Sequence, residues 1–272
     1  MSKVYQALKK AEKESIIDKG ILSLCDKEEK PMGILSTPNI SSFDQHLVSL
    51  LDANSIAAEQ YRKLRTRILQ FSASSLKTVL ITSSTSQEGK SITAANLAIT
   101  IAQGVDQHVL LVDGDLRQPS IHKLFGLDTN YGLTDYLTEN IDIAKVIVNS
   151  GIPKLKLLLS GSFSNKPSEL IASKKMKDLI QELKSRYDDR YIIIDSTPVT
   201  ATDEPDILAE QVDGIIMVVR AGKTSREVIE RALSALNAEN ILGVVFNRVE
   251  FATKRLSYGS YYGYYPYGNK RT

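Results

Sequence analysis

The 272-residue sequence has few of the residues that build disulfides or metal centres. Its single cysteine, Cys25, cannot form an internal disulfide or a cysteine metal cluster. Its three histidines, His46, His108 and His122, lie far apart and form no HExxH pattern. These scarcities argue against a structural zinc site.

Long apolar runs are also missing. The longest, around residues 215–219, is far shorter than the roughly 20 residues that cross a bilayer. The opening MSKVYQALKKAEKES carries charges throughout and has no apolar core, so it is not a secretory signal. Lys and Arg number 34 against 32 acidic residues, which gives no whole-chain argument for nucleic acid. We therefore expect a cytoplasmic protein that reaches a membrane only through a partner.

The chain divides into three predicted zones. Residues 1–50 combine a short helical pattern with a linker that contains Pro, Gly and Ser, and we expect a leader. Residues 51–250 carry the fold. Residues 251–272 contain six tyrosines, four basic residues and no acidic ones, and their composition predicts a disordered tail.

Short apolar runs alternate with helical patterns in the middle zone. The predicted strands are Thr78–Thr82, Val109–Val112, Leu155–Leu159, Tyr191–Ile194, Gly214–Val219 and Leu242–Phe246. The predicted helices include Ser91–Ile101, Ser168–Tyr187 and Arg226–Asn237. Several strands are apolar without alternation, as expected when both faces of a sheet are covered. This order predicts an α/β fold with a parallel sheet and helices on both faces.

The run VLITSSTSQEGKSITAANLA, residues 79–98, has the strand–loop–helix pattern of a phosphate-binding loop. Backbone N–H groups of such a loop and of the following helix point at phosphate oxygens. Gly89 would let the backbone approach closely, Lys90 would reach the β- and γ-phosphates, and the Ser91 hydroxyl would bind Mg²⁺. The pattern G-x-x-x-x-G-K-[ST] has Ser84 in place of its first glycine, so GKS alone could also be an ordinary turn and helix cap.

Two acidic segments strengthen the phosphate-loop interpretation. Asp113 and Asp115 follow a buried strand two positions apart, and alternate residues of an extended chain point the same way. Paired carboxylates there could hold Mg²⁺ or accept a proton. Asp195 ends the apolar run YIIID on another strand. Each segment alone could be a turn or cap, but the three together predict a nucleotide site.

Together, these segments resemble the bacterial tyrosine kinases (BY-kinases) of capsule and exopolysaccharide export, in the MinD/ParA-like branch of P-loop proteins. ITSS…EGKS resembles their Walker A region, VLLVDGDLRQP the Walker A′ motif, IIID the Walker B motif, and NKPSELIAS the NPSELL segment between them. The opening SKVYQALKKAEKE resembles a subgroup associated with chain-length determination. The resemblance covers about residues 50–250 and implies a P-loop NTPase-like, mostly parallel sheet.

Three departures from the family pattern stand out. Ser86 and Gln87 replace a usual Pro-Gly pair, which could shift the loop geometry. Asp195 is followed by Ser-Thr-Pro instead of Thr-Pro-Pro. Thr85 stands where MinD and ParA proteins carry a signature lysine, which argues against that sister group.

The resemblance implies ATP and Mg²⁺ as cofactors and Lys90, Asp113 and Asp115 as catalytic residues. Asp113 would accept the tyrosine hydroxyl proton. Ser91, Asp113, Asp115 and Asp195 would hold Mg²⁺, with Asp195 acting through water. The predicted nucleotide-binding residues are Ser84, Thr85, Ser86, Gln87, Glu88, Gly89, Lys90, Ser91, Ile92, Arg220 and Asn247. Arg220 and Asn247 would lie near the base, although both could equally be ordinary polar loop residues.

The resemblance also predicts roles for two further segments. Glu59, Arg62 and Arg65, spaced three apart, could be a solvated helix face with ion pairs. The family, however, has a Glu-x-x-Arg-x-x-Arg motif that contacts the neighbouring subunit of a ring, and we prefer that interpretation. The predicted phosphorylation sites in the tail are Tyr258, Tyr261, Tyr262, Tyr264, Tyr265 and Tyr267.

The expected function is an ATP-dependent protein-tyrosine autokinase that acts between subunits and regulates exopolysaccharide or capsule assembly and export. It would need a separate membrane activator or polysaccharide co-polymerase, would lie at the inner face of the plasma membrane, and would not bind nucleic acid. The main alternative is a MinD/ParA-like ATPase switch without tyrosine kinase activity. A nucleotide-binding co-polymerase partner with little catalysis is a third.

Overall fold

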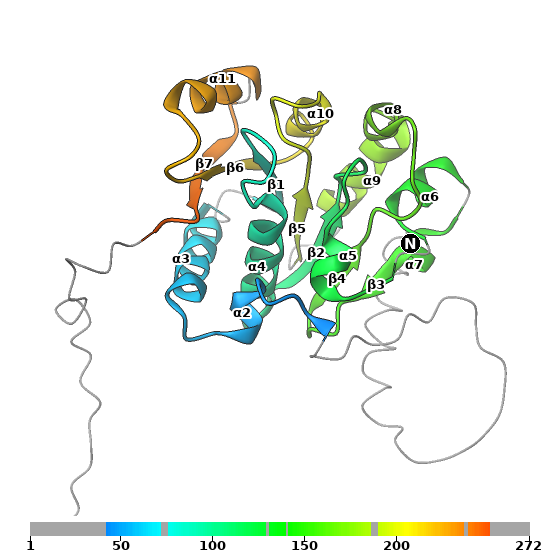
Figure 1. Cartoon of the computed structure of the whole chain (residues 1–272). Coiled ribbons are helices and arrows are strands. Elements are labelled where there is room, and N and C mark those ends of the chain that lie inside the picture. Colours follow the sequence, from blue (N-terminus) through cyan, green and yellow to red (C-terminus); the bar gives the residue numbers. More distant parts are fainter. Residues whose placement is uncertain are drawn as a thin grey trace, which may run out of the picture.

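The apolar runs form a seven-stranded sheet with the order β3-β4-β2-β5-β1-β6-β7 (Figure 1). The computed structural model describes residues 42–71, 76–128, 131–139, 141–185, 190–236 and 239–250. The strands are β1 Thr78–Ser83, β2 His108–Asp113, β3 Ile147–Asn149, β4 Leu155–Leu158, β5 Arg190–Asp195, β6 Gly214–Arg220 and β7 Ile241–Asn247. Every neighbouring pair is parallel except β3–β4. The predicted mostly parallel α/β sheet is confirmed.

Helices cover both faces of this sheet (Figure 1). Alternate residues of a strand point to opposite faces, and β1 shows the result: Leu80 lies in one apolar core, whereas Val79 and Ile81 lie in the other. The first core is closed by α6 Leu133–Thr138, α7 Ile143–Val146, α8 Pro167–Ile171, α9 Lys174–Ser185, α10 Glu204–Ala209 and α11 Arg226–Leu236. The second is closed by α2 Val48–Leu51, α3 Ile56–Phe71, α4 Lys90–Ala102 and α5 Ile121–Phe125.

The predicted helix Ser168–Tyr187 was wrong as one element, because two helices, α8 and α9, occupy most of this stretch. Between them the Ser173 hydroxyl accepts a hydrogen bond from the Met176 backbone N–H at 3.2 Å. Serine at this position caps the start of a new helix, which explains the break.

The packed domain begins before residue 50, where the sequence analysis placed the end of the leader. Phe43 and Leu47 are buried, and the Phe43 ring meets Phe125 edge-on at 6.0 Å between centroids. The Asn96 amide accepts a hydrogen bond from the Ser49 N–H at 2.9 Å. Burial of Phe43 and Leu47 and the hydrogen bond to Asn96 therefore attach to the domain a segment that its composition predicted to be linker. The predicted leader before residue 42 and the predicted tail 251–272 lie outside the described residues.

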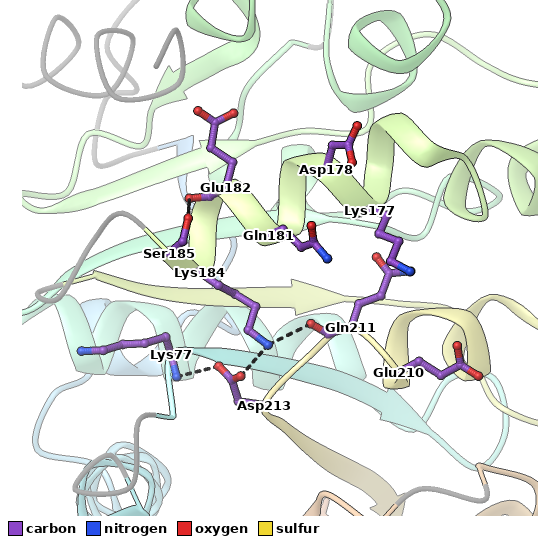
Figure 2. A pocket seen from close by; sticks show the side chains of 10 residues that line it. All are labelled: Lys77, Lys177, Asp178, Gln181, Glu182, Lys184, Ser185, Glu210, Gln211 and Asp213. Carbon is purple, nitrogen blue, oxygen red and sulfur yellow. Dashed lines mark hydrogen bonds and ion pairs between the residues drawn. The ribbon is translucent and has the colours of Figure 1, made fainter. Parts of the chain in front are cut away.

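A hollow of about 870 Å³ opens at the edge where β1 and β6 begin, the edge opposite the phosphate loop (Figure 2). Within it, Lys184 of α9 pairs with Asp213 at 2.6 Å. Asp213 also accepts hydrogen bonds from the backbone N–H groups of Lys77 at 2.9 Å and Thr78 at 2.8 Å. Burial opposes ionisation of Asp213, but these hydrogen bonds outweigh it and lower its pKa. Asp213, which directly precedes β6, therefore links α9 to the start of β1.

None of the helices among the described residues is both long enough and apolar enough to cross a membrane.

Candidate active site

The phosphate loop connects the buried strand β1 to α4, the thirteen-residue helix that begins at Lys90. Two of its residues adopt left-handed backbone conformations, Gln87 with φ 63° and Gly89 with φ 95°. A Cβ atom on Gly89 would lie 2.1 Å from Nδ2 of Asn247, so alanine there would displace the Asn247 side chain and would also be strained by the positive φ. Gln87 takes a conformation that costs a non-glycine residue about 1–2 kcal/mol. The departure at Ser86-Gln87 thus places a strained residue in the turn.

Glu88 organises the loop from inside, because its side chain is only 2% exposed. One carboxylate oxygen accepts a hydrogen bond from the Thr85 N–H at 2.8 Å. The other accepts from the Arg220 N–H at 3.2 Å and from the Thr224 hydroxyl. Its backbone carbonyl accepts from the Asn247 amide at 2.9 Å. Both residues predicted near the base therefore contact the loop itself, Arg220 through its backbone and Asn247 through its side chain.

The segment after β5 supports the other side of the loop. The Val199 N–H donates to the Ser83 carbonyl at 2.9 Å, and the Thr200 hydroxyl donates to the Ser84 carbonyl at 2.7 Å. Sequence reasoning missed Thr200 and Thr224. They lie 116 and 136 residues from their partners, and a lone hydroxyl residue after a strand carries no pattern that could have identified them.

Lys90 and the three predicted aspartates converge at the carboxyl edge of the sheet. Asp113 and Asp195 end the neighbouring strands β2 and β5 and pair in register. Nζ of Lys90 lies 2.7 Å from Oδ2 of Asp115 and 3.9 Å from Oδ1 of Asp195. The Ser91 hydroxyl lies 3.3 Å from the same nitrogen. Five residues predicted from three separate motifs therefore share one site.

The site concentrates negative charge in a buried place. Burial, together with the nearby Asp195, raises the pKa of Asp113 to about 8. Burial raises the pKa of Asp195 to about 6, against the opposing effect of Lys90. Burial would lower the pKa of Lys90, but the attraction of Asp195 and Asp115 outweighs it and raises that pKa. The lysine is therefore fully charged and holds the acidic cluster together.

Several carboxylate oxygens here have unused bonding capacity. Oδ2 of Asp113 accepts hydrogen bonds from the N–H groups of Ser120 at 3.2 Å and Ile121 at 3.1 Å. Oδ1 of Asp113 and both carboxylate oxygens of Asp195 are buried without a hydrogen-bond partner among the described residues. Because buried polar atoms are normally satisfied, these oxygens mark a place where a cation or a proton donor would be stabilised.

The residues fit a magnesium nucleotide better than a metal ion alone. In the described ranges, no group of three His, Cys, Asp or Glu side chains is arranged to hold a metal by itself. Mg²⁺ in nucleotide sites usually binds one or two carboxylates together with phosphates and water. The free oxygens of Asp113 and Asp195, the Ser91 hydroxyl and the amino-terminus of α4 supply that combination.

The predicted interface residues lie on α3. Arg62 pairs with Glu59 at 2.6 Å, and Arg65 donates to the Thr100 carbonyl of α4 at 3.1 Å. All three border a hollow of about 710 Å³. Ile92, predicted to bind nucleotide, packs in part against the core beneath the loop. The predicted phosphorylation sites Tyr258–Tyr267 lie outside the described residues.

Comparison with known proteins assigns the family. The AAA domain family AAA_31 matches residues 76–239. Tyrosine-protein kinase YwqD of Bacillus subtilis (strain 168) is 37% identical over 228 residues, which cover 83% of this chain and 93% of YwqD. This chain belongs to the bacterial tyrosine-protein kinase family. The resemblance inferred from the motifs is thereby confirmed. Two relatives from Ralstonia are longer, and this chain covers 30% of their length.

Two solved structures, one of them a tyrosine kinase domain, have the same fold as this chain. The chimerical protein CapA2B2 has a TM-score of 0.70 and is 30% identical, with 76% of this chain and 92% of that chain covered. The kinase domain of the Escherichia coli tyrosine kinase ETK has a TM-score of 0.71 and is 26% identical, with 91% of both chains covered. The sheet and phosphate loop are therefore those of a P-loop nucleotide-binding fold.

Proposed function

We propose that this chain is an ATP-dependent protein-tyrosine kinase that phosphorylates its carboxyl-terminal tyrosine cluster. The transfer would occur between subunits, from the site of one subunit to the tail of another. One observation carries the proposal. Lys90 of the phosphate loop lies against Asp115 and near Asp195, with the partly unsatisfied Asp113 beside them. Membership in the tyrosine kinase family supports a protein tyrosine as the acceptor.

Each residue has a distinct role in this proposal. Bound MgATP supplies the phosphoryl group and neutralises much of its developing charge. Lys90 would turn from Asp115 to the β- and γ-phosphates, while Ser91, Asp113, Asp115 and Asp195 would hold the Mg²⁺, Asp195 through water. Oδ1 of Asp113, which has no hydrogen-bond partner among the described residues, would take the proton from the tyrosine hydroxyl. The neighbouring Mg²⁺ would favour the charged form of this carboxyl, which is the form that accepts a proton.

The contact between β7 and the phosphate loop supports the tail as acceptor. Asn247, the last residue of β7, donates to the Glu88 carbonyl, so the chain leaves the domain beside the site. The tail carries four basic and no acidic residues, and each phosphate would add about −1.5 to −2 charge. Several phosphates would reverse the charge of the tail and loosen a ring by repulsion.

Assembly into a ring through α3 is part of the proposal. Replacing Arg62 and Arg65 together with alanine should lower the mass of the assembly in light scattering, since these guanidinium groups would pair with the neighbour. The control is Arg226→Ala, which breaks an exposed ion pair on α11 and should leave the mass unchanged. An unchanged mass for the α3 variant would place the interface elsewhere.

A membrane partner completes the proposed function. We infer that a separate activator or polysaccharide co-polymerase brings the kinase to the inner face of the plasma membrane. There it would regulate exopolysaccharide or capsule biosynthesis and export. The relatives' function as tyrosine kinases and the motif resemblance support this role, and no feature of the charge distribution points to nucleic acid.

The test is mass spectrometry of protein isolated from its native host, where any activator is present. Wild type should carry phosphotyrosine among residues 258–267. Lys90→Met should lose it, because the lysine that holds the phosphates is gone. The exposed α9 variant Lys177→Met serves as the matched control and should retain it. An unmodified wild-type tail with intact ATP hydrolysis would instead favour the MinD/ParA-like ATPase switch.

A further inference from the structure

A buried glutamate, Glu204, joins three segments at the carboxyl edge of the sheet. It is the first residue of α10, and its side chain is 1% exposed. It accepts hydrogen bonds from Arg117 at 2.9 Å, Ser168 at 2.8 Å and Thr197 at 3.1 Å. Arg117 also donates to the Ser168 hydroxyl at 3.0 Å, so the arginine, the serine and the glutamate form a closed triangle.

Two of these segments lead directly to the acidic residues of the site. The Gln118 N–H donates a hydrogen bond to Oδ1 of Asp115 at 2.9 Å and closes a turn that contains Arg117. Oδ2 of the same aspartate pairs with Nζ of Lys90. Thr197 follows Asp195 by two residues. Glu204 is thus bonded to the loop after β2 and to the loop after β5, although it touches neither Lys90 nor an aspartate in any described contact.

The hydrogen bonds keep Glu204 charged in its buried position. Burial alone would raise the pKa of this carboxyl, but its hydrogen bonds, including those from Ser168, Arg117 and Thr197, outweigh burial and lower the pKa. A charged acceptor makes stronger hydrogen bonds than a neutral one. The carboxylate can therefore bind the two loops together more firmly than a neutral side chain of the same shape.

We propose that Glu204 is a positioning residue that fixes the loop carrying Asp115 against the loop that follows Asp195, and so sets the spacing of the two metal-binding carboxylates. The inference deepens the proposed function and rests on it for the role of those carboxylates. Groups that hydrogen-bond directly to metal ligands typically contribute about 10–100-fold in metal affinity. Glu204 acts one contact further away, so we expect an effect at the lower end of this range.

The first test measures the loops without any nucleotide. In Glu204→Gln and Arg117→Lys, amide hydrogen exchange in the full chain should accelerate in residues 114–120 and also in residues 196–203. Lysine cannot contact both Glu204 and Ser168 as the forked guanidinium does. The control variant Glu230→Ala removes an ion pair of similar length, Arg226–Glu230 at 2.7 Å, which lies exposed on α11. It should leave both loops unchanged.

The second test measures the Mg²⁺ requirement. The Mg²⁺ concentration for half-maximal binding of a fluorescent ATP analogue should rise by about 10-fold in Glu204→Gln. A purely structural role would lower the melting temperature and the fraction of active protein but leave this midpoint unchanged, and that result would overturn the proposal. So would faster exchange in only one of the two loops.

These readouts separate the positioning role from the kinase proposal. Neither hydrogen exchange nor analogue binding requires transfer to tyrosine. If the Mg²⁺ midpoint shifts while the wild-type tail stays unmodified in its host, Glu204 positions the site of an ATPase, and the kinase proposal fails alone. If the tail is modified but the midpoint does not move, the kinase stands and the role of Glu204 is refuted.

Discussion

Replacing Gly89 with alanine should weaken ATP binding by about 100-fold, which corresponds to about 2.8 kcal/mol. The new methyl group would lie 2.1 Å from the Asn247 amide, in a backbone conformation that L-residues avoid. Either Asn247 releases the Glu88 carbonyl or Gly89 changes its conformation, and both movements deform the loop that surrounds the phosphates. Isothermal titration with MgATP measures the loss directly.

Gly222 provides the matched control for this prediction. It too has a positive φ, 70°, but no described atom lies within 4 Å of its virtual Cβ. Gly222→Ala therefore carries the conformational strain of about 1–2 kcal/mol without the collision. It should bind ATP within about threefold of wild type, a difference of under 1 kcal/mol. Equal losses in both variants would show that the Asn247 contact is not the reason for glycine at position 89.

Asp113→Asn should lower the rate of phosphoryl transfer to tyrosine by about 1,000-fold, within the range that general-base catalysis contributes. The amide oxygen can still accept the hydrogen bonds of Ser120 and Ile121, so the loop after β2 keeps its conformation. The amide cannot take a proton, however. ATP binding should therefore change far less than single-turnover transfer measured with saturating MgATP.

Asp135→Asn is the control for the Asp113 prediction. Asp135 is also buried, and it accepts backbone hydrogen bonds from Gly132 at 2.7 Å and Ser162 at 3.0 Å. It belongs to α6 and takes no part in the lysine–aspartate cluster. If both variants lost transfer equally, the defect would lie in loop structure and not in proton acceptance.

The same Asp113 variant should stabilise the nucleotide-free protein at alkaline pH. The pKa of Asp113 is about 8 when folded and about 3.9 in an unfolded chain. Between these values the folded state holds a proton that the unfolded state has released, so wild-type stability falls as pH rises. The wild-type melting temperature should drop more steeply from pH 6 to pH 8 than that of Asp113→Asn. Each kcal/mol lost from the free energy of unfolding lowers the melting temperature by about 2–4 °C. Parallel slopes would contradict the raised pKa.

Strands could be predicted from the sequence more completely than helices. Continuous apolar runs such as Tyr191–Ile194 are typical of strands covered on both faces, and all six predicted strands are present. The seventh, β3, has only three residues and follows α7 without a turn residue. Helices of five or six residues, such as α5 and α10, complete too few turns to establish a 3.6-residue period.

Site residues that belong to short sequence motifs could be predicted, whereas residues that reach the site only through tertiary contacts could not. Lys90 and the three aspartates belong to short patterns whose strand-end positions bring them to one edge. Glu204 lies 87 residues from Arg117, and its role depends on burial that no local pattern encodes. Asn247 was predicted near the base because of its strand, but only the packed structure places its amide on the Glu88 carbonyl.

The place where β7 ends has a consequence for the chemistry of the tail. Tyr258 lies eight residues beyond Glu250, and a fully extended chain spans about 3.3–3.6 Å per residue. The first acceptor therefore stays within about 30 Å of its own domain, and assembly would place it near the neighbouring subunit that modifies it. Short tethers produce local concentrations in the millimolar range. Once subunits have assembled, modification of the tail should not slow on dilution, and free peptides should compete poorly with the tethered tyrosines.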